Sequence, residues 1–231
     1  MVTIVAHRGA PKRARENTLK SFLTAASLGA DMIELDVRRT SDGIPIIFHD
    51  MWLSRKTRRP LLAGLTYQEI NRRASKKKFH VPTLEETLKA LAGKVMLDIE
   101  LKEPGYETEV IKLVRRYFTD DRFILTSFHP VIIAAVKLFD PKLTVGLILA
   151  KSKDLPYVEK TEADVLAPEK DLFASQRKIF ADFKKQGKRI AVWTVDGKAL
   201  LSNLLVDPLV DAVITNYPDR ALALRTKLCH T

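Results

Sequence analysis

Two acidic residues, Glu34 and Asp36, stand two positions apart inside an apolar run. Of the residues in this chain, they are the clearest candidates for binding a metal ion. In a strand, this spacing places both carboxylates on one face, because successive side chains alternate. Two buried acids on one face repel each other and are poorly solvated unless a cation lies between them. His7 precedes the pair, His49 follows it, and a second strand-like run carries Glu100. The pattern predicts a divalent-metal enzyme with two histidines beside the metal.

Three carboxylates from neighbouring strands would offer hard oxygen ligands, which suit Mg²⁺, Ca²⁺ or Mn²⁺. Zinc fits less well, because the sequence has neither a cysteine pair nor a paired-histidine helix pattern. Each residue alone also has a simpler interpretation. His7 could be a buried core histidine, and Glu34 could pair with a nearby arginine. Glu100 and Lys102 could form a plain ion pair. These interpretations do not explain why all of the residues stand at the ends of predicted strands.

Short apolar strands alternate with amphipathic helices and must position these residues. The eight expected strands are Thr3–Ala6, Met32–Val37, Val95–Leu101, Phe123–Thr126, Leu143–Ile148, Val165–Ala167, Ile190–Trp193 and Ala212–Thr215. The alternation favours a parallel (β/α)₈ TIM barrel, with a doubly wound open sheet as the alternative. In a barrel, catalytic residues gather at the C-terminal ends of the strands, which is where the acids and histidines stand.

A ninth apolar run, Ile44–Phe48, follows the second strand too closely for a helical crossover. The dipeptide Asp42-Gly43 is a strong signal for a two-residue hairpin, so this run should return antiparallel. Counting back from that turn places His49 opposite Asp36. Pro45 is acceptable in the returning strand because that strand should lie at an edge of the sheet.

The clearest helix starts are marked by capping residues. Asn17 is the expected N-cap of a helix whose apolar positions begin at Leu19. Thr83 and Glu86 form a capping-box pattern that opens a second helix, running to Leu91.

The net charge of +11 is unevenly distributed. Between Met51 and His80 there are nine basic residues and one acid, so this segment supplies 9 − 1 = +8 of the total. Such a cluster is compatible with nucleic acid, anionic lipid or a phosphorylated substrate, and equally with a solvated helix face. No aromatic interleaving or nucleic-acid motif accompanies it, so we do not expect nucleic acid as a partner.

The length and composition limit the number of domains, the disulfide content and the possible membrane spans. We expect one domain over residues 1–231, in which residues 51–80 form a small basic insertion over one barrel face. The single cysteine, Cys229, excludes an internal disulfide framework. No apolar run reaches the roughly 18 residues needed to span a bilayer, and the expected location is cytoplasmic.

A series of short motifs, in order along essentially the whole chain, resembles the signature of glycerophosphodiester phosphodiesterases. The motifs are His7-Arg8-Gly9, Glu16-Asn17-Thr18, Glu34-x-Asp36-Val37, His49-Asp50, Pro82-Thr83-Leu84-Glu85-Glu86, Ile99-Glu100-x-Lys102, Ser127-Phe128, Val192-Trp193-Thr194-Val195 and Ile214-Thr215-Asn216-Tyr217-Pro218. The chain departs from the family pattern at Asn216, where an aspartate is common, and at Lys56 in a run that often reads Arg-Thr-Thr.

The resemblance implies a TIM-barrel enzyme that hydrolyses glycerophosphodiesters to an alcohol and glycerol 3-phosphate. It also implies a role for eight side chains. The implied divalent-metal ligands are Glu34, Asp36 and Glu100, the acid–base pair is His7 and His49, the phosphate contacts are Arg8 and Lys102, and the pocket wall is Trp193.

Several alternatives stay open at this point. The nucleophile is either water or the glycerol 2-hydroxyl, and either histidine can be the acid or the base. The same site could instead act as a lysophospholipase D, with the basic insertion against an anionic lipid surface. A third hypothesis is an inactive barrel that binds phosphodiesters or nucleic acid.

Overall fold

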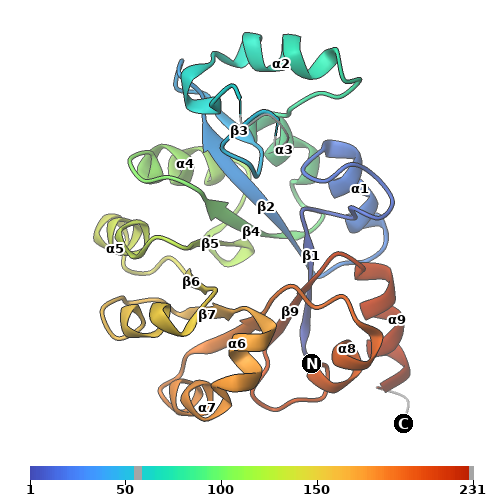
Figure 1. The fold of residues 1–231 in the computed structure, drawn as a ribbon, viewed down its shortest axis with the longest axis vertical. Coiled ribbons are helices and arrows are strands. Elements are labelled where there is room, and N and C mark those ends of the chain that lie inside the picture. Colours follow the sequence, from blue (N-terminus) through green and yellow to red (C-terminus); the bar gives the residue numbers. More distant parts are fainter. Residues whose placement is uncertain (55–58, 229–231) are drawn as a thin grey trace.

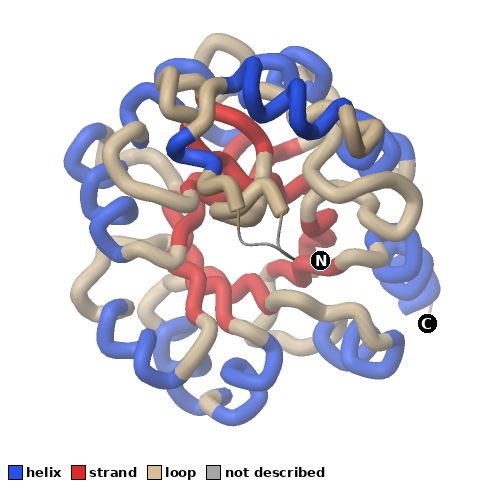
Figure 2. Tube along the Cα trace, turned by 45° about the horizontal axis from the view of Figure 1, so that its top comes forward, coloured by secondary structure: helices blue, strands red, loops and turns tan. Residues whose placement is uncertain are grey.

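Parallel strands form a closed ring that is surrounded by helices in the computed structural model, which describes residues 1–54 and 59–228 (Figures 1 and 2). The eight strands of the ring are β1 (Thr3–His7), β2 (Met32–Arg39), β4 (Met96–Leu101), β5 (Phe123–Ser127), β6 (Val145–Leu149), β7 (Val165–Pro168), β8 (Arg189–Val192) and β9 (Ala212–Thr215). A further strand, β3 (Pro45–Ile47), pairs antiparallel with β2 outside the ring. The eight strands expected from the sequence are confirmed, with shifts of one or two residues at their ends.

The barrel closes because β1 pairs with β9 on one side and with β2 on the other. Seven pairings run in the order β1-β9-β8-β7-β6-β5-β4-β2, and β1 also pairs with β2. In that closing pair, Val5 and His7 are opposite Met32 and Glu34. The fold is therefore the predicted parallel eight-stranded TIM barrel, and the open-sheet alternative is wrong.

Helices pack outside the ring. They are α1 (Leu19–Ser27), α2 (Tyr67–Ser75), α3 (Leu84–Leu91), α4 (Glu107–Val114), α5 (Pro130–Phe139), α6 (Lys170–Ser175), α7 (Arg177–Lys185), α8 (Lys198–Leu204) and α9 (Pro218–Leu228), with short 3₁₀ helices η1 (Leu62–Gly64), η2 (Asp120–Arg122) and η3 (Ser152–Tyr157). Apart from that of α2, their buried apolar faces form the main core against the outer face of the strands. A smaller apolar cluster, including Val5, Met32 and Ile214, fills the barrel interior.

Helix starts follow local capping chemistry. The Thr83–Glu86 capping box at the start of α3 is confirmed, because each side chain bonds the other residue's backbone N–H. The prediction that Asn17 is the N-cap of the first helix is wrong by one residue. Thr18 caps α1 by accepting from the Ser21 N–H, while Asn17 has a left-handed φ of +55° and points into the barrel site.

The hairpin after β2 forms, but its register differs from the expected one by a residue. Val37 pairs with Ile47, and the Phe48 N–H donates to the Asp36 carbonyl, so Phe48, not His49, lies opposite Asp36. The cause is a three-residue loop in which Gly43 has φ +82°, a conformation that favours glycine. Pro45 lies in β3 at the sheet edge, as expected.

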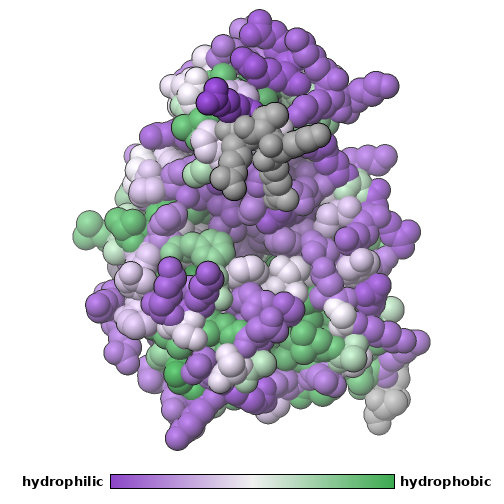
Figure 3. Space-filling view, in the orientation of Figure 1, coloured by the Kyte–Doolittle hydropathy of each residue, from purple (hydrophilic) through white to green (hydrophobic). Residues whose placement is uncertain are grey.

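The segment after β3 forms a small structure beside the barrel. Its apolar side chains, including Leu62 and Ile70, make a separate core with Ile46 of β3. In Figure 1 this segment, with α2, lies at one end of the molecule, and hydrophilic side chains cover that end in Figure 3. Leu53 and Lys77 line a cleft that also contains His49, so the segment stands next to the C-terminal ends of the strands. No helix in the described ranges is long and apolar enough to cross a membrane.

Candidate active site

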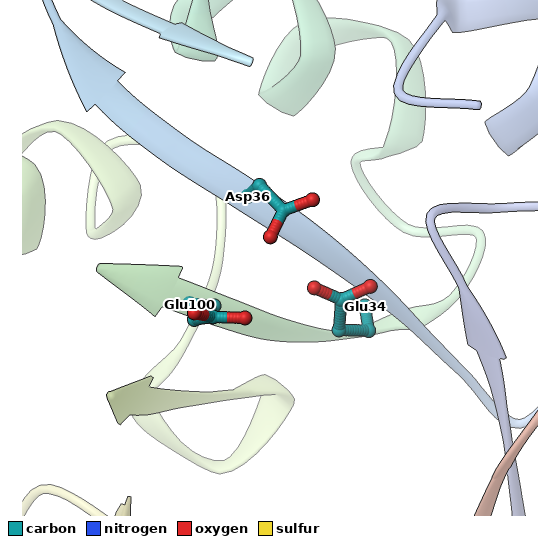
Figure 4. A group of neighbouring side chains, drawn as sticks. All are labelled: Glu34, Asp36 and Glu100. Atoms are coloured by element: carbon teal, nitrogen blue, oxygen red, sulfur yellow. The ribbon is translucent and has the colours of Figure 1, made fainter. Parts of the chain in front are cut away.

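Three carboxylates from two paired strands converge inside the barrel (Figure 4). Glu34 and Asp36 come from β2 and Glu100 from β4, where Asp36 is directly opposite Glu100. One oxygen of each acid lies within 4.8 Å of the others, and all three residues are buried. The expected spacing of two residues therefore places both β2 acids on the inner face of the barrel.

Two cations lie against this acidic cluster. The Nε of Arg8 is 3.1 Å from Asp36 Oδ2, and the Nζ of Lys102 is 2.8 Å from Asp36 Oδ1. Lys102 also forms an ion pair with Glu100. Burial alone would raise the pKa of Asp36, but the charges of Lys102 and Arg8 outweigh it and hold that pKa well below its ordinary value. Asp36 is thus the carboxylate of the cluster whose charged form is most favoured by its neighbours.

The positive charge near the other two acids is too small to offset the effect of burial on their pKa values. Burial, followed by the neighbouring Asp36, raises the pKa of Glu34 well above its ordinary value. Burial likewise raises the pKa of Glu100 to about 7, despite Lys102. Glu34 Oε1 is buried and has no hydrogen-bond partner among the described residues. These are the features of a ligand set that a divalent cation would complete, and carboxylate oxygens are the donors that Mg²⁺, Ca²⁺ and Mn²⁺ prefer.

Both expected histidines border the cluster from different elements. His7 ends β1, and its Nε2 is 4.0 Å from Glu34 Oε2. Burial and the adjacent Arg8 lower the pKa of His7 to about 4. His49 follows β3, and its Nδ1 lies 2.8 Å from Asp50 Oδ1. Burial lowers the pKa of His49, and Asp36 and Asp50 oppose that shift.

One pocket of about 460 Å³ unites these groups. The expected site residues that line it are His7, Arg8, Glu34, His49, Glu100, Lys102 and Trp193, and Asp36 lies beneath its floor. Trp193 donates from Nε1 to the Ala167 carbonyl at 2.7 Å and meets the Phe128 ring edge-on, with centroids 5.6 Å apart. The pocket therefore has a charged side and an aromatic wall. The structure brings together all eight residues that the sequence singled out.

The sequence interpretation assigned no role in the site to two residues that border it. Asn17 donates from Nδ2 to Asp36 Oδ2 at 2.7 Å. Asp98 lines the pocket and accepts from Thr126 Oγ1 at 2.6 Å, and burial raises its pKa to about 7. Asp98 precedes Glu100 by two positions in one strand, so the alternation of strand side chains was a usable signal for it. The Asn17 contact joins a loop to a strand and has no signal in the local sequence.

A comparison with known protein families identifies the chain. Residues 7–220 match the model of the "Glycerophosphoryl diester phosphodiesterase family". The chain belongs to this family. A glycerophosphodiester phosphodiesterase of Caldanaerobacter subterraneus subsp. tengcongensis is 30% identical over 238 residues, covering 97% of this chain and 98% of that protein. One of Bacillus altitudinis is 29% identical, covering 99% and 100%.

Solved structures of similar proteins share this fold. A phosphodiesterase of Oleispira antarctica, solved in complex with the product sn-glycerol-3-phosphate, is 26% identical with a TM-score of 0.83 and 96% of each chain covered. A structure from Silicibacter pomeroyi, 22% identical with a TM-score of 0.85, shows the same fold over 99% of this chain and 94% of that one. The chain is thus an enzyme of the glycerophosphoryl diester phosphodiesterase family, which hydrolyses glycerophosphodiesters.

Proposed function

We propose that this pocket cleaves a glycerophosphodiester to an alcohol and glycerol 3-phosphate with the help of a divalent cation and two histidines. We further propose that residues 1–231 form one TIM-barrel phosphodiesterase domain with an insertion at 51–80. The observation that carries the metal proposal is the convergence of three buried carboxylates within 4.8 Å, one with an unpartnered oxygen. Two cations and two histidines border that cluster in one pocket.

The ligands of the cation in this proposal are Glu34, Asp36 and Glu100, and the ion is Mg²⁺ or Ca²⁺, with Mn²⁺ as a further choice. When bound, such an ion supplies positive charge that stabilises the non-bridging oxygens of the phosphate. Enzymes of this family generally depend on a divalent cation. A cation here would also reverse the raised pKa values of Glu34 and Glu100, because it favours their charged forms.

Arg8 and Lys102 recognise the phosphate in this proposal. Both side chains are mostly buried and line the pocket, where low solvent content strengthens their attraction for an anion. Arg8 is additionally held by its backbone N–H, which donates to Glu34 Oε2 at 2.8 Å. Trp193 closes the pocket opposite the charged side and contacts the apolar part of the substrate.

His7 and His49 transfer the protons in this proposal. One takes the proton of the attacking hydroxyl as the new P–O bond forms, and the other gives a proton to the departing alkoxide oxygen. Both a water molecule and the glycerol 2-hydroxyl satisfy this scheme as nucleophile. Because the two rings reach the pocket from separate elements, β1 and the segment after β3, they can serve opposite sides of one phosphate.

A substrate panel with Mg²⁺, Ca²⁺ and Mn²⁺ against a chelator control tests the proposal. We expect glycerophosphocholine turnover with at least one ion and none with the chelator. Glu100→Gln and His49→Ala should each lower kcat by roughly 10²- to 10⁴-fold. The matched control is His80→Ala, because His80 is an exposed histidine of the same insertion. If no diester is turned over with any ion, the inactive-barrel hypothesis replaces this one.

The insertion supports a second candidate, a lysophospholipase D that works at an anionic lipid surface. The exposed end of α2 and the following turn carry Arg72, Arg73 and three lysines, Lys76 to Lys78. Each such charge contributes about 1 kcal/mol at an anionic membrane. Turnover of lysophosphatidylcholine but not glycerophosphocholine, with cosedimentation on phosphatidylserine vesicles, would establish this candidate over the first. Salt-sensitive binding to DNA without turnover of either substrate would contradict both.

A further inference from the structure

A chain of hydrogen bonds runs from the back of the His7 ring to the loop after β8. His7 Nδ1 lies 2.9 Å from Asn216 Oδ1, directly after β9. Asn216 then donates twice to one carboxylate, from Nδ2 to Asp196 Oδ2 at 2.8 Å and from its backbone N–H to Asp196 Oδ1 at 2.9 Å. The side of His7 that faces away from the pocket therefore rests on an ordered polar network.

This network leaves Asn216 one orientation. The oxygens of a carboxylate only accept hydrogen bonds, so the Asn216 amide must present its NH₂ group to Asp196. Its oxygen is then the atom that faces His7. Asp196 is itself fixed, because Thr215 Oγ1 donates to its Oδ1 at 3.2 Å and the Arg220 guanidinium donates to its backbone carbonyl at 2.6 Å. A flipped amide would place its NH₂ against His7 and its oxygen against the Asp196 carboxylate.

An amide oxygen also only accepts, so the His7 nitrogen facing it must carry the hydrogen. We propose that Asn216 and Asp196 are positioning residues that hold neutral His7 as the Nδ1–H tautomer, with an unprotonated Nε2 directed to the acidic cluster. Nε2 is the ring nitrogen 4.0 Å from Glu34. The orienting group of His7 is thus a neutral amide, whereas that of His49 is the carboxylate of Asp50.

The tautomer makes His7 the base of the proposed reaction and not the acid, and this consequence rests on the proposed function. A ring with a lone pair at Nε2 accepts the proton of the attacking hydroxyl as the new P–O bond forms. The proton for the departing oxygen then comes from His49 as the old P–O bond breaks. One proton is taken and one is given, so this cleavage step leaves His7 protonated and His49 neutral. With water as the nucleophile, solvent then restores both rings; with the 2-hydroxyl, hydrolysis of the resulting cyclic phosphate restores them, with the two roles reversed.

Nitrogen NMR of the imidazole rings measures the tautomer directly. The full chain is labelled with ¹⁵N in histidine, and spectra are recorded at about pH 8, above the ordinary histidine pKa of about 6.5. The His7 signals are assigned by their loss in His7→Gln. In the wild type we expect a pyrrole-type shift at Nδ1 and a pyridine-type shift at Nε2. In Asn216→Leu, which removes the acceptor at similar volume, the two shifts should move toward each other as both tautomers are populated.

Kinetics supply the second readout. We expect Asn216→Leu to lower kcat by roughly 10- to 100-fold with little change in KM. This loss is smaller than the full rate enhancement that acid–base catalysis supplies, because His7 itself is retained. The double variant Asn216→Asp/Asp196→Asn exchanges the two groups, so that residue 216 still accepts from Nδ1–H and residue 196 donates to it; this pair should keep the wild-type tautomer. The control is Asn203→Leu, an exposed asparagine on α8, which should change neither readout.

The outcomes separate this inference from the proposed function. A pyrrole-type Nε2 in the wild type overturns the inference, as does an unchanged tautomer in Asn216→Leu. The wild-type spectrum decides the matter even if Asn216→Leu does not fold. If the expected tautomer is found but no diester is turned over with any ion, the proposed function fails and the assignment of Asn216 and Asp196 stands.

Discussion

Replacement of Asn17 by glycine tests whether the acidic cluster binds a metal and whether the surrounding residues tune it. The Asn17 amide donates to Asp36 Oδ2 at 2.7 Å and orients a carboxylate that is a proposed ligand. Its φ of +55° suits glycine, so Asn17→Gly removes the amide without straining the backbone. Partners of this kind change metal affinity by roughly 10- to 100-fold, which corresponds to about 1.4 to 2.8 kcal/mol. We expect a loss of that size for Mn²⁺.

Isothermal titration with Mn²⁺ and urea unfolding of the metal-free chain give the two measurements. The loss of one hydrogen bond to a buried charge should lower the free energy of unfolding by about 1.5–3 kcal/mol. Asn17→Ala should lose a further ~1–2 kcal/mol of stability, because alanine is strained at this positive φ, with no further loss of metal affinity. Asn203→Ala, on the exposed face of α8, is the control. Wild-type Mn²⁺ affinity in Asn17→Gly would refute the reasoning.

Three further predictions concern packing, acid stability and metal removal. Gly146→Ala should lower the free energy of unfolding in urea by about 1–3 kcal/mol, because its Cβ would lie 2.8 Å from Thr126 Cγ2 inside the barrel. Burial raises the pKa of Asp207, but the hydrogen bonds from Arg177 outweigh burial and hold that pKa below its ordinary value of about 3.9. The ion pair therefore stabilises the fold above about pH 3.9, and its contribution disappears as the pH falls through the lowered pKa. The wild type should therefore exceed Asp207→Asn in melting temperature at neutral pH, with the gap closing in acid; a constant gap would contradict this. EDTA should abolish turnover, and Mg²⁺, Ca²⁺ or Mn²⁺ should restore it; full activity in EDTA would contradict the metal proposal.

Residues whose position follows from local periodicity were predictable from the sequence. Glu34 and Asp36 share a face because a strand alternates, and Thr83 caps α3 because its own side chain and that of Glu86 complete the box. The barrel followed in the same way, from eight apolar runs separated by helical patterns. In each case the pattern that predicts the feature can be recognised in short stretches of the chain.

Features that depend on contacts between distant segments were not predictable. The one-residue error in the hairpin register came from the conformation of Gly43, which extends the turn from two residues to three. Asn17 is a residue type that commonly caps helices, but its side chain instead donates a hydrogen bond to Asp36 on β2. Asn216 bonds Asp196 twenty positions away and His7 at the other end of the chain. No short pattern in the sequence encodes such contacts.

The separate apolar core of the segment after β3 has a consequence for how this enzyme loses activity on heating. A small core that includes Ile46, Leu62 and Ile70 is packed apart from the main one, and local cores of this kind open at a lower free energy than the whole molecule. His49 lies where this segment leaves the barrel, so its opening would withdraw one proposed proton carrier from an otherwise folded protein. Amide hydrogen exchange should be fastest in α2 among the described helices near the site. Inactivation should then begin below the melting temperature of the barrel and reverse on cooling.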